Sequence, residues 1–259
     1  MTERIIERSE GPVGWLIFNN PERRNAVSVD MWEAIPQVLE RFSANSEVRV
    51  VVLAGAGDKA FVSGADISQF EKDRSSADAV QRYEELAETA QARLQNFDKP
   101  VIAMIRGYCL GGGLNIANIC DLRIAAEDAR FGIPAAKMGL GYRASSMKNL
   151  VDVVGAPFAR EIMITARQFN AQEAKDMGLV HRVVPVAELE KVTREYCDMI
   201  AANAPLTMRA AKRIIREVSK SAYDAELCRT WVKECFESED YKEGRRAFME
   251  KRKPVFKGR

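Results

Sequence analysis

The chain has 259 residues, of which 47% are hydrophobic, so it is long enough to bury the core of one large domain or two small ones. Its 39 basic and 37 acidic residues almost balance, and no basic stripe is interleaved with aromatic residues, which excludes nucleic acid as an expected partner. The start, residues 1–4, lacks the basic-then-apolar pattern of a secretion signal, and no apolar run approaches the roughly 20 residues of a membrane span. These features predict a cytoplasmic protein with no membrane partner.

The cysteine and histidine content argues against a metal site. There are five cysteines, an odd number, with no CxxC spacing, and a single histidine, His181, at a helix-to-strand junction. We expect reduced thiols, no metal ion and a structural role for His181.

The first 53 residues predict a strand hairpin, a helix and a buried strand: strands over 3–8, 13–19 and 48–53, and a helix over 29–43. Gly11-Pro12 forms the turn of the hairpin. Ser28 is placed to cap the helix, and Pro36 inside it should bend it.

The segment from residue 60 to 76 combines small residues with a charged stretch. The small side chains of Ser63, Gly64 and Ala65 let another group approach the backbone closely. Asp66 is expected to cap the next turn, and residues 68–76 are charged and expected to be mobile. An amphipathic helix is predicted over 77–97.

Three consecutive glycines, Gly111 to Gly113, form the most informative stretch. The predicted strand 101–106 leads into them, and a sequence able to form a helix follows. The first turn of such a helix presents unpaired N–H groups and the positive end of the helix dipole, and no side chain blocks the approach of a carbonyl oxygen. The alternative is a close-packed strand–helix turn without a ligand.

After the glycines a short strand is predicted over 120–125, followed by an irregular, glycine-containing loop over 129–142 that is expected to line a site. Helices then dominate, with a short strand over 179–184 among them: 145–153, 156–166, 171–177, 186–203, 205–221, 224–236 and 238–250. Asn170 is predicted to cap one of them. The expected fold class is α/β, with a helical C-terminal layer.

Two backbone segments could together form an oxyanion hole. One N–H would come from the turn at Ser63, Gly64 and Ala65, and one from the helix start at the glycines. Each such donor is worth about 3–4 kcal/mol in the transition state of a reaction that develops an oxyanion. Asn115 follows Gly112 by one helical turn and lies on the same face.

An ordered set of motifs resembles the crotonase (enoyl-CoA hydratase/isomerase) superfamily over nearly the whole chain. The matching segments are 19–21 with 25–26, 61–67, 99–103, 107–113, 120–125, 131–134, 177–180 and 248–254. The resemblance implies a spiral of ββα units over residues 1–200 and a helical trimerisation region over 201–259. Homotrimers, often paired into hexamers, would be expected.

The resemblance also implies a substrate and a site. The substrate would be an acyl-coenzyme A thioester, with coenzyme A as part of the substrate and no separate cofactor. Ala65 and Gly112 would supply the oxyanion hole, and Asn115 and Tyr142 would be the other catalytic candidates. Substrate-binding candidates are Arg24, Asn25, Ala26, Ser63, Gly64, Asp66, Ile67, Gly111, Ala135 and, from a neighbouring subunit, Lys253.

Two positions depart from the hydratases of this superfamily. Those hydratases carry glutamates where this chain has Asn115 and Ala135. Neither asparagine nor alanine can act as a general acid or base near neutral pH. Such groups contribute typically 10²–10⁴-fold each, so hydration should be weak.

Tyr142 is a third departure. It stands eleven residues after Phe131, where superfamily decarboxylases acting on methylmalonyl-CoA have a tyrosine, although those enzymes carry histidine where this chain has Ala65. Tyr142 either donates a hydrogen bond or a proton in the pocket, or fills the space of the missing glutamates. Three functions remain open: an enoyl-CoA hydratase or isomerase, a decarboxylase-like enzyme, and a non-catalytic acyl-CoA-binding protein.

Overall fold

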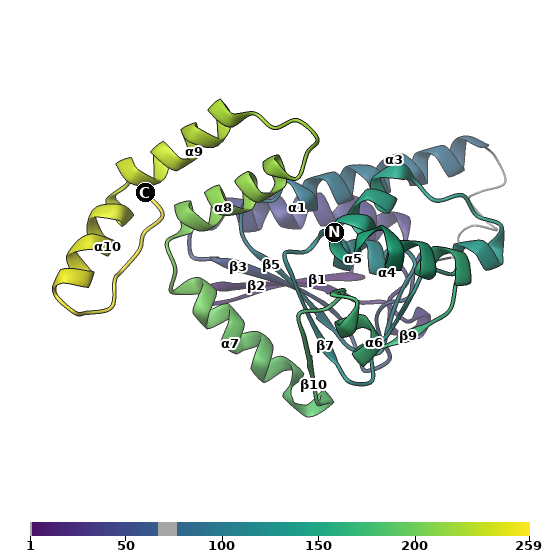
Figure 1. The fold of residues 1–259 in the computed structure, drawn as a ribbon. Coiled ribbons are helices and arrows are strands. Elements are labelled where there is room, and N and C mark those ends of the chain that lie inside the picture. The colour runs from purple at the N-terminus through teal and green to yellow at the C-terminus, as the bar shows by residue number, and fades with distance from the viewer. Residues whose placement is uncertain (1, 67–76) are drawn as a thin grey trace.

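A computed structural model describes residues 2–66 and 77–259. Its strands form two sheets, with helices α1 and α3 on one side of the larger sheet and α7 on the other (Figure 1). The six-stranded sheet has the order β1-β2-β3-β5-β7-β10, and the four-stranded sheet has the order β4-β6-β8-β9. As the chain advances it supplies strands to the two sheets in turn, as expected for the spiral of ββα units that the family resemblance implies.

The strand bounds are as follows: β1 (Ile5–Glu10), β2 (Val13–Phe18), β3 (Val50–Gly55), β4 (Ala60–Val62), β5 (Val101–Ile105), β6 (Tyr108–Leu110), β7 (Leu122–Ala126), β8 (Arg130–Gly132), β9 (Phe169–Asn170) and β10 (Arg182–Val184). The α-helices are α1 (Val29–Ala44), α3 (Ala77–Gln95), α4 (Gly112–Ile119), α5 (Ala144–Thr165), α6 (Ala171–Asp176), α7 (Leu189–Ala201), α8 (Pro205–Val218), α9 (Ala225–Glu237) and α10 (Glu239–Met249). Short 3-10 helices are Pro21–Arg23, Pro134–Met138 and Val186–Glu188.

Strand β3 has an almost continuous apolar sequence, and its side chains pack into two separate cores. Val51 and Leu53 belong to the core that includes α1, whereas Val50 and Val52 belong to a second core under α7. Because successive side chains of a strand point to opposite faces, both faces of β3 are buried. The predicted doubly buried strand is confirmed, shifted two residues toward the C-terminus.

The strand that enters the glycines is not the predicted one. β5 ends at Ile105 in the larger sheet, and β6 of the smaller sheet leads into Gly111. Gly107 makes the turn between them with φ of +60°, and a Cβ there would lie 2.1 Å from the carbonyl oxygen of Lys59. This change of sheet cannot be recognised in the sequence, because β5 and β6 are both buried and both apolar.

Other predictions were wrong in detail. The loop 129–142 contains β8 and a 3-10 helix, and β4 was not predicted, because three-residue elements leave little periodicity. Ser28 occupies the N-cap position of α1 but makes no side-chain cap; its hydroxyl donates to Asp30 instead. The helix expected from 186 begins at Leu189 after a 3-10 turn.

Several helix boundaries are confirmed. Asn170 accepts a hydrogen bond from the N–H of Glu173, whose side chain accepts one from the N–H of Asn170, which is a complete capping box. The two helices predicted over 145–166 appear as α5 with a kink at Gly155, where φ is +72°. Helix α1 continues through Pro36.

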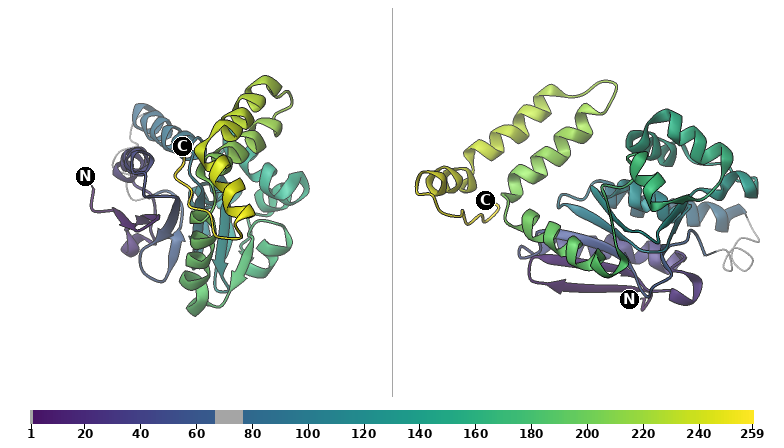
Figure 2. Two further views of the ribbon diagram at one scale, coloured as in Figure 1. Left: turned by 90° about the vertical axis from the view of Figure 1, so that its left-hand side faces the viewer. Right: turned by 60° about the horizontal axis from the view of Figure 1, so that its bottom comes forward.

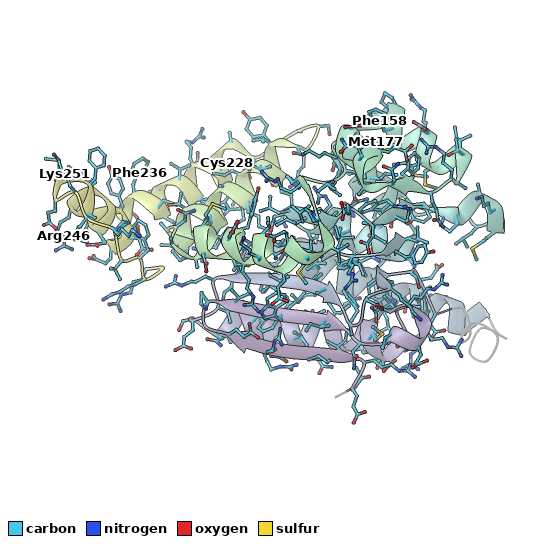
Figure 3. All side chains as sticks on the ribbon, turned by 90° about the horizontal axis from the view of Figure 1, so that it is seen from below. Phe158, Met177, Cys228, Phe236, Arg246 and Lys251 are labelled. Carbon is cyan, nitrogen blue, oxygen red and sulfur yellow. The ribbon has the colours of Figure 1, made fainter. Side chains whose placement is uncertain are left out.

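Helices α8 to α10 extend beyond the sheets as an arm (Figure 2). The last residues of the chain fold back along this arm, because the buried Asp240 carboxylate accepts hydrogen bonds from the N–H groups of Lys257 and Gly258, at 2.7 and 2.8 Å. Phe236, Arg246 and Lys251 lie at the end of the arm, and Phe158 and Met177 lie at the opposite end of the molecule (Figure 3). No helix in the described part of the chain is long and apolar enough to cross a membrane.

Candidate active site

The segment that follows β4 is fastened to the loop that precedes α1. The N–H of Val27 donates to the carbonyl oxygen of Gly64 at 2.9 Å, and the N–H of Asp66 donates to that of Val27 at 3.1 Å. Nearer to β4, the N–H of Ser63 donates to the carbonyl oxygen of Arg24 at 3.1 Å. These three bonds hold the backbone around Ala65 in a fixed position.

The glycine stretch approaches the same place from β6. Gly111 has φ of +52°, in the region that glycine tolerates, and its N–H donates to the carbonyl oxygen of Gly132 at 2.9 Å. A Cβ at Gly113 would lie 2.1 Å from the carbonyl oxygen of Val62. The absence of a side chain at Gly113 therefore lets the first turn of α4 pack directly against the end of β4.

This packing brings Gly112 beside Ala65. A Cβ added at Gly112 would lie 4.0 Å from the nitrogen of Ala65 and 3.9 Å from two backbone atoms of Gly64. Among the described residues, neither the N–H of Ala65 nor that of Gly112 has a hydrogen-bond partner. The two donors expected to form an oxyanion hole are thus adjacent, and the start of α4 adds its positive dipole end.

Asn115 is buried at the junction of three helices. Its Nδ2 donates to Oε1 of Gln91 on α3 at 2.7 Å and to Oγ of Ser146 on α5 at 2.9 Å. Its Oδ1 is buried without a partner among the described residues. Asn115 therefore ties α4 to its neighbours and keeps one acceptor unoccupied.

Tyr142 contacts the glycine turn. Its hydroxyl donates to the carbonyl oxygen of Gly111 at 3.4 Å, and burial raises the pKa of Tyr142 to about 12. The hydroxyl is therefore protonated at neutral pH. Ala135 is buried in the 3-10 helix that begins at Pro134, and the ring of Pro134 packs near Gly111.

The loop expected to bind coenzyme A is built around Asn25. Arg24 and Asn25 have φ of +52° and +57°, and the Asn25 side chain is fully buried. Its Nδ2 donates to the carbonyl oxygens of Ala56 and Ala60, at 2.9 and 2.7 Å, while its Oδ1 accepts from the N–H of Asn20 at 3.0 Å. The side chain of Asn25 therefore organises the loop from inside.

Replacing Asn25 with alanine should lower the free energy of unfolding by about 2–4 kcal/mol, because several buried backbone groups lose their partners. Urea denaturation measures this loss. Asn25→Gly loses the same bonds but accepts the left-handed backbone, so it should be the less damaged variant. A loss below about 0.5 kcal/mol for Asn25→Ala would contradict the assigned role.

A polar hollow of about 510 Å³ opens beside this loop. Arg24 and Lys59 line it together with the acidic Glu22 and Asp58. The guanidinium of Arg24 also lies 4.9 Å from the ring centre of Tyr108. Lys59 could not be predicted as a site residue from the sequence, since a lone lysine in a glycine-rich loop carries no distinctive signal. Its position beside Arg24 is the signal, and it appears only in three dimensions.

The remaining candidates are less concentrated. Ser63 and Gly64 lie in the fastened segment, Ala26 and Asp66 are buried beside it, and Lys253 is exposed on the C-terminal tail. Ile67 lies outside the described residues, as do residues 68–76 and the turn that Asp66 was expected to cap.

Arg143, which immediately precedes α5, makes two ion pairs with α3. Its guanidinium lies 3.8 Å from the carboxylate of Glu84 and 3.6 Å from that of Glu88, and its side chain is 29% exposed. Both partners are on α3, so these contacts join the start of α5 to that helix.

The far end of α4 is held by a buried arginine. Arg123 donates from its guanidinium to the carbonyl oxygens of Ala117, Cys120 and Leu179, at 2.7 to 3.1 Å. A cation at the last carbonyls of a helix is favoured by the dipole. The N–H of Arg123 donates to Nδ1 of His181 at 3.1 Å, so this ring nitrogen must be unprotonated.

The pKa of His181 is lowered, first by burial and then by the charges of Arg123 and Lys175. Because the folded protein binds this proton less readily than the unfolded chain, the contribution of His181 to stability is complete above the ordinary pKa of 6.5. It is lost as pH falls below that value toward the lowered one. Urea denaturation from pH 5 to 8 should show this loss in the parent protein and less of it in His181→Gln, which does not titrate. Identical pH profiles would contradict the prediction.

No three His, Cys, Asp or Glu side chains within residues 2–66 and 77–259 are grouped so that they could hold a metal ion. The geometry instead offers two main-chain donors, a buried amide and a protonated phenol. Of these groups, the two adjacent main-chain N–H donors have the arrangement that can stabilise an oxyanion.

A sequence model described as Enoyl-CoA hydratase/isomerase matches residues 8–259. The chain belongs to this family. It is 36% identical to a short-chain-enoyl-CoA hydratase of Clostridium acetobutylicum over 96% of this chain and 95% of the relative. It is 33% identical to a crotonyl-CoA hydratase of Syntrophomonas wolfei over 98% of both chains.

Solved structures agree with this membership. An enoyl-CoA hydratase/carnithine racemase from Magnetospirillum magneticum superposes with a TM-score of 0.93 at 33% identity, covering 100% of this chain and 97% of that one. An enoyl-CoA hydratase from Bacillus anthracis gives 0.91 at 32% identity, with coverage of 99% and 100%. The α/β crotonase fold with its C-terminal helical region is therefore established for this family member.

Proposed function

We propose that this protein is an acyl-CoA enzyme that stabilises a thioester enolate between the N–H groups of Ala65 and Gly112. The observation that carries the proposal is the adjacency of these two unpaired donors, fixed by the contact of Gly113 with Val62. The thioester oxygen would accept both hydrogen bonds as negative charge develops on it. Arg24 and Lys59, which line one hollow, are suited to the phosphates of coenzyme A.

Hydration of an enoyl-CoA is the first reaction to test, because the named relatives are hydratases. In it, water adds OH to C3 and a proton to C2 of the acyl group. The buried amide of Asn115 and the methyl group of Ala135 offer no base for that water, so we expect hydration slower than in a hydratase with two carboxylates.

Decarboxylation of a methylmalonyl-CoA-like thioester is the second candidate, favoured by Tyr142. Loss of carbon dioxide leaves the enolate, and the chemistry then needs only a proton at C2. A phenol whose pKa is near 12 is protonated at neutral pH, and its hydroxyl lies next to Gly111. Solvent would restore the donated proton.

The decisive experiment assays the purified protein with crotonyl-CoA and with methylmalonyl-CoA, beside titration calorimetry with both. Turnover of one substrate supports the enzyme and identifies the reaction. Hydration of crotonyl-CoA as fast as in the named hydratases would contradict the inferred weakness of Asn115 and Ala135. Binding without any turnover would favour a non-catalytic acyl-CoA-binding protein.

Tyr142→Phe should reduce kcat for decarboxylation by 10²-fold or more, since a positioned proton donor contributes typically 10²–10⁴-fold. KM should change little. The matched control is Tyr223→Phe on the exposed α8–α9 connection, which should leave kcat unaltered. If Tyr142→Phe retains full activity, the phenol fills space and donates no proton.

We further propose that the protein forms homotrimers through its C-terminal arm. An open, mainly apolar hollow of about 780 Å³ lies between α8, α9 and α10, and Phe248 and Met249 at its edge are 83% and 80% exposed. Apolar surface of this kind usually marks an interface. Light scattering of the purified protein tests the state, and a monomer would contradict it.

A further inference from the structure

A third, smaller pocket lies beside the larger sheet. It has a volume of about 270 Å³ and forms where the C-terminal tail meets the body, at the amino ends of β3 and β5. The lining contains four basic residues and one acidic residue: Arg49, Lys99, Arg209, Lys257 and Asp98.

The acidic residue does not neutralise the cations around it. Both carboxylate oxygens of Asp98 accept from the guanidinium of Arg213, at 2.7 and 2.8 Å. Arg209 is paired with Glu234 on α9 at 3.1 Å. These two ion pairs account for Asp98 and Arg209. The other three cations of the pocket are Arg49, Lys99 and Lys257.

The side chains of Lys99 and Arg49 hydrogen-bond only to uncharged groups, whereas Lys257 also lies beside Asp240, which accepts a hydrogen bond from its backbone N–H. The ammonium of Lys99 donates to the carbonyl oxygens of Phe42 and Asn45, which end α1, and Arg49 donates to the carbonyl oxygen of Phe256 at 3.1 Å. Lys257 is exposed, and none of the three makes an ion pair among the described residues. An ammonium has three protons, so Lys99 keeps one for a further acceptor.

The start of α8 adds to the positive potential. Pro205 and Leu206 of its first turn line the pocket, and the N-cap residue Ala204 provides no side-chain cap. The first N–H groups of this 14-residue helix and the positive end of its dipole are thus near the three cations. Burial and the charge of Arg49 lower the pKa of Lys99 to about 8, as expected for cations crowded without a counterion.

We propose that this pocket, formed by Arg49, Lys99, Lys257 and the start of α8, binds a small phosphate-type oxyanion that joins the C-terminal tail to the body. The pocket is smaller than the roughly 300–1,000 Å³ typical of organic-ligand sites, which favours a single oxyanion group over a nucleotide. The anion would bridge Lys257 of the tail and Arg49 of the body. The inference is independent of the reaction at Gly112.

Thermal unfolding of the full-length protein in 0–20 mM inorganic phosphate, with sodium chloride holding the ionic strength constant, tests the site. Tm should rise with phosphate, because a ligand that binds the folded state stabilises it. In Lys257→Gln the dissociation constant for phosphate should increase at least fivefold. The control Lys233→Gln makes the same charge change on α9 and should respond as the parent does.

A spectroscopic measurement keeps the test local. The Lys99 ammonium, followed by NMR during a pH titration, should show a pKa that rises when phosphate is added, since a nearby anion favours the charged form. Coenzyme A and dephospho-coenzyme A at equal concentration distinguish the sources. If coenzyme A displaces phosphate and dephospho-coenzyme A does not, the pocket binds the 3′-phosphate of coenzyme A. If neither compound displaces phosphate, the pocket binds free phosphate. The proposal is overturned if phosphate has no effect beyond chloride, or if Lys257→Gln responds as the parent does.

Discussion

Gly112→Pro is expected to lower kcat for the acyl-CoA substrate by 10²–10³-fold, the typical cost of losing one oxyanion-hole donor. Gly112 is the first residue of α4, the helical position where proline is best tolerated, and its predecessor Gly111 has no Cβ to clash with the proline ring. The substitution therefore removes the N–H and leaves the helix intact. Stopped assays give kcat, and circular dichroism checks the fold.

The control for this variant is Gly141→Ala, where a Cβ meets nothing within 4 Å and φ is ordinary. It should retain both kcat and Tm. A Gly112→Pro protein that folds and keeps the parent kcat would show that the enolate oxygen does not bind this N–H.

Gly113→Ala is expected to lower the free energy of unfolding by about 3 kcal/mol or more, at or beyond the upper end of the usual overpacking range. The new methyl carbon would lie 2.1 Å from the carbonyl oxygen of Val62, and neither backbone can move without disturbing β4 or α4. Any molecules that fold should also lose about 10²-fold in kcat, because a shift near 1 Å separates the two donors. Urea denaturation and the same assay measure the two effects.

Gly244→Ala makes the identical change inside α10, where the nearest atoms are those of the Phe256 ring at 3.5 Å. Since alanine is the better helix former, this control should gain about 0.5–1 kcal/mol. Equal stability of Gly113→Ala and the parent protein would mean that α4 does not depend on its close contact with β4.

The glycine stretch shows how far sequence can predict this site. Three glycines before a helix indicate an exposed helix start, and the family motifs pair it with Ala65. The adjacency of Gly112 and Ala65 depends on β4 and β6 being neighbouring strands of one sheet, and neither strand was predicted from the sequence. The exchange of sheets between β5 and β6 could not be predicted, since Gly107 interrupts a run that is apolar on both sides.

Most features of the site that could not be predicted from the sequence depend on contacts between residues far apart in the chain. The bonds from Asn115 to Gln91 and Ser146 span 24 and 31 residues, and no local pattern announces them. Asn25 is a polar residue in a loop, yet it is fully buried. Its amide bonds to main-chain groups that have no backbone partner there. Tyr142 is placed by the 3-10 helix before it, an element too short to leave a periodic signal.

The contact of Gly113 with Val62 has a consequence for how this protein could change its chemistry. Both donors of the proposed oxyanion hole, and the atoms that hold them together, belong to the main chain, so the proposed hole does not depend on any particular side chain. Positions 115, 135 and 142 can then vary without dismantling it. Such a scaffold permits new reactions to arise by substitution at a few surrounding positions, and a library at these three would be a direct way to search for them.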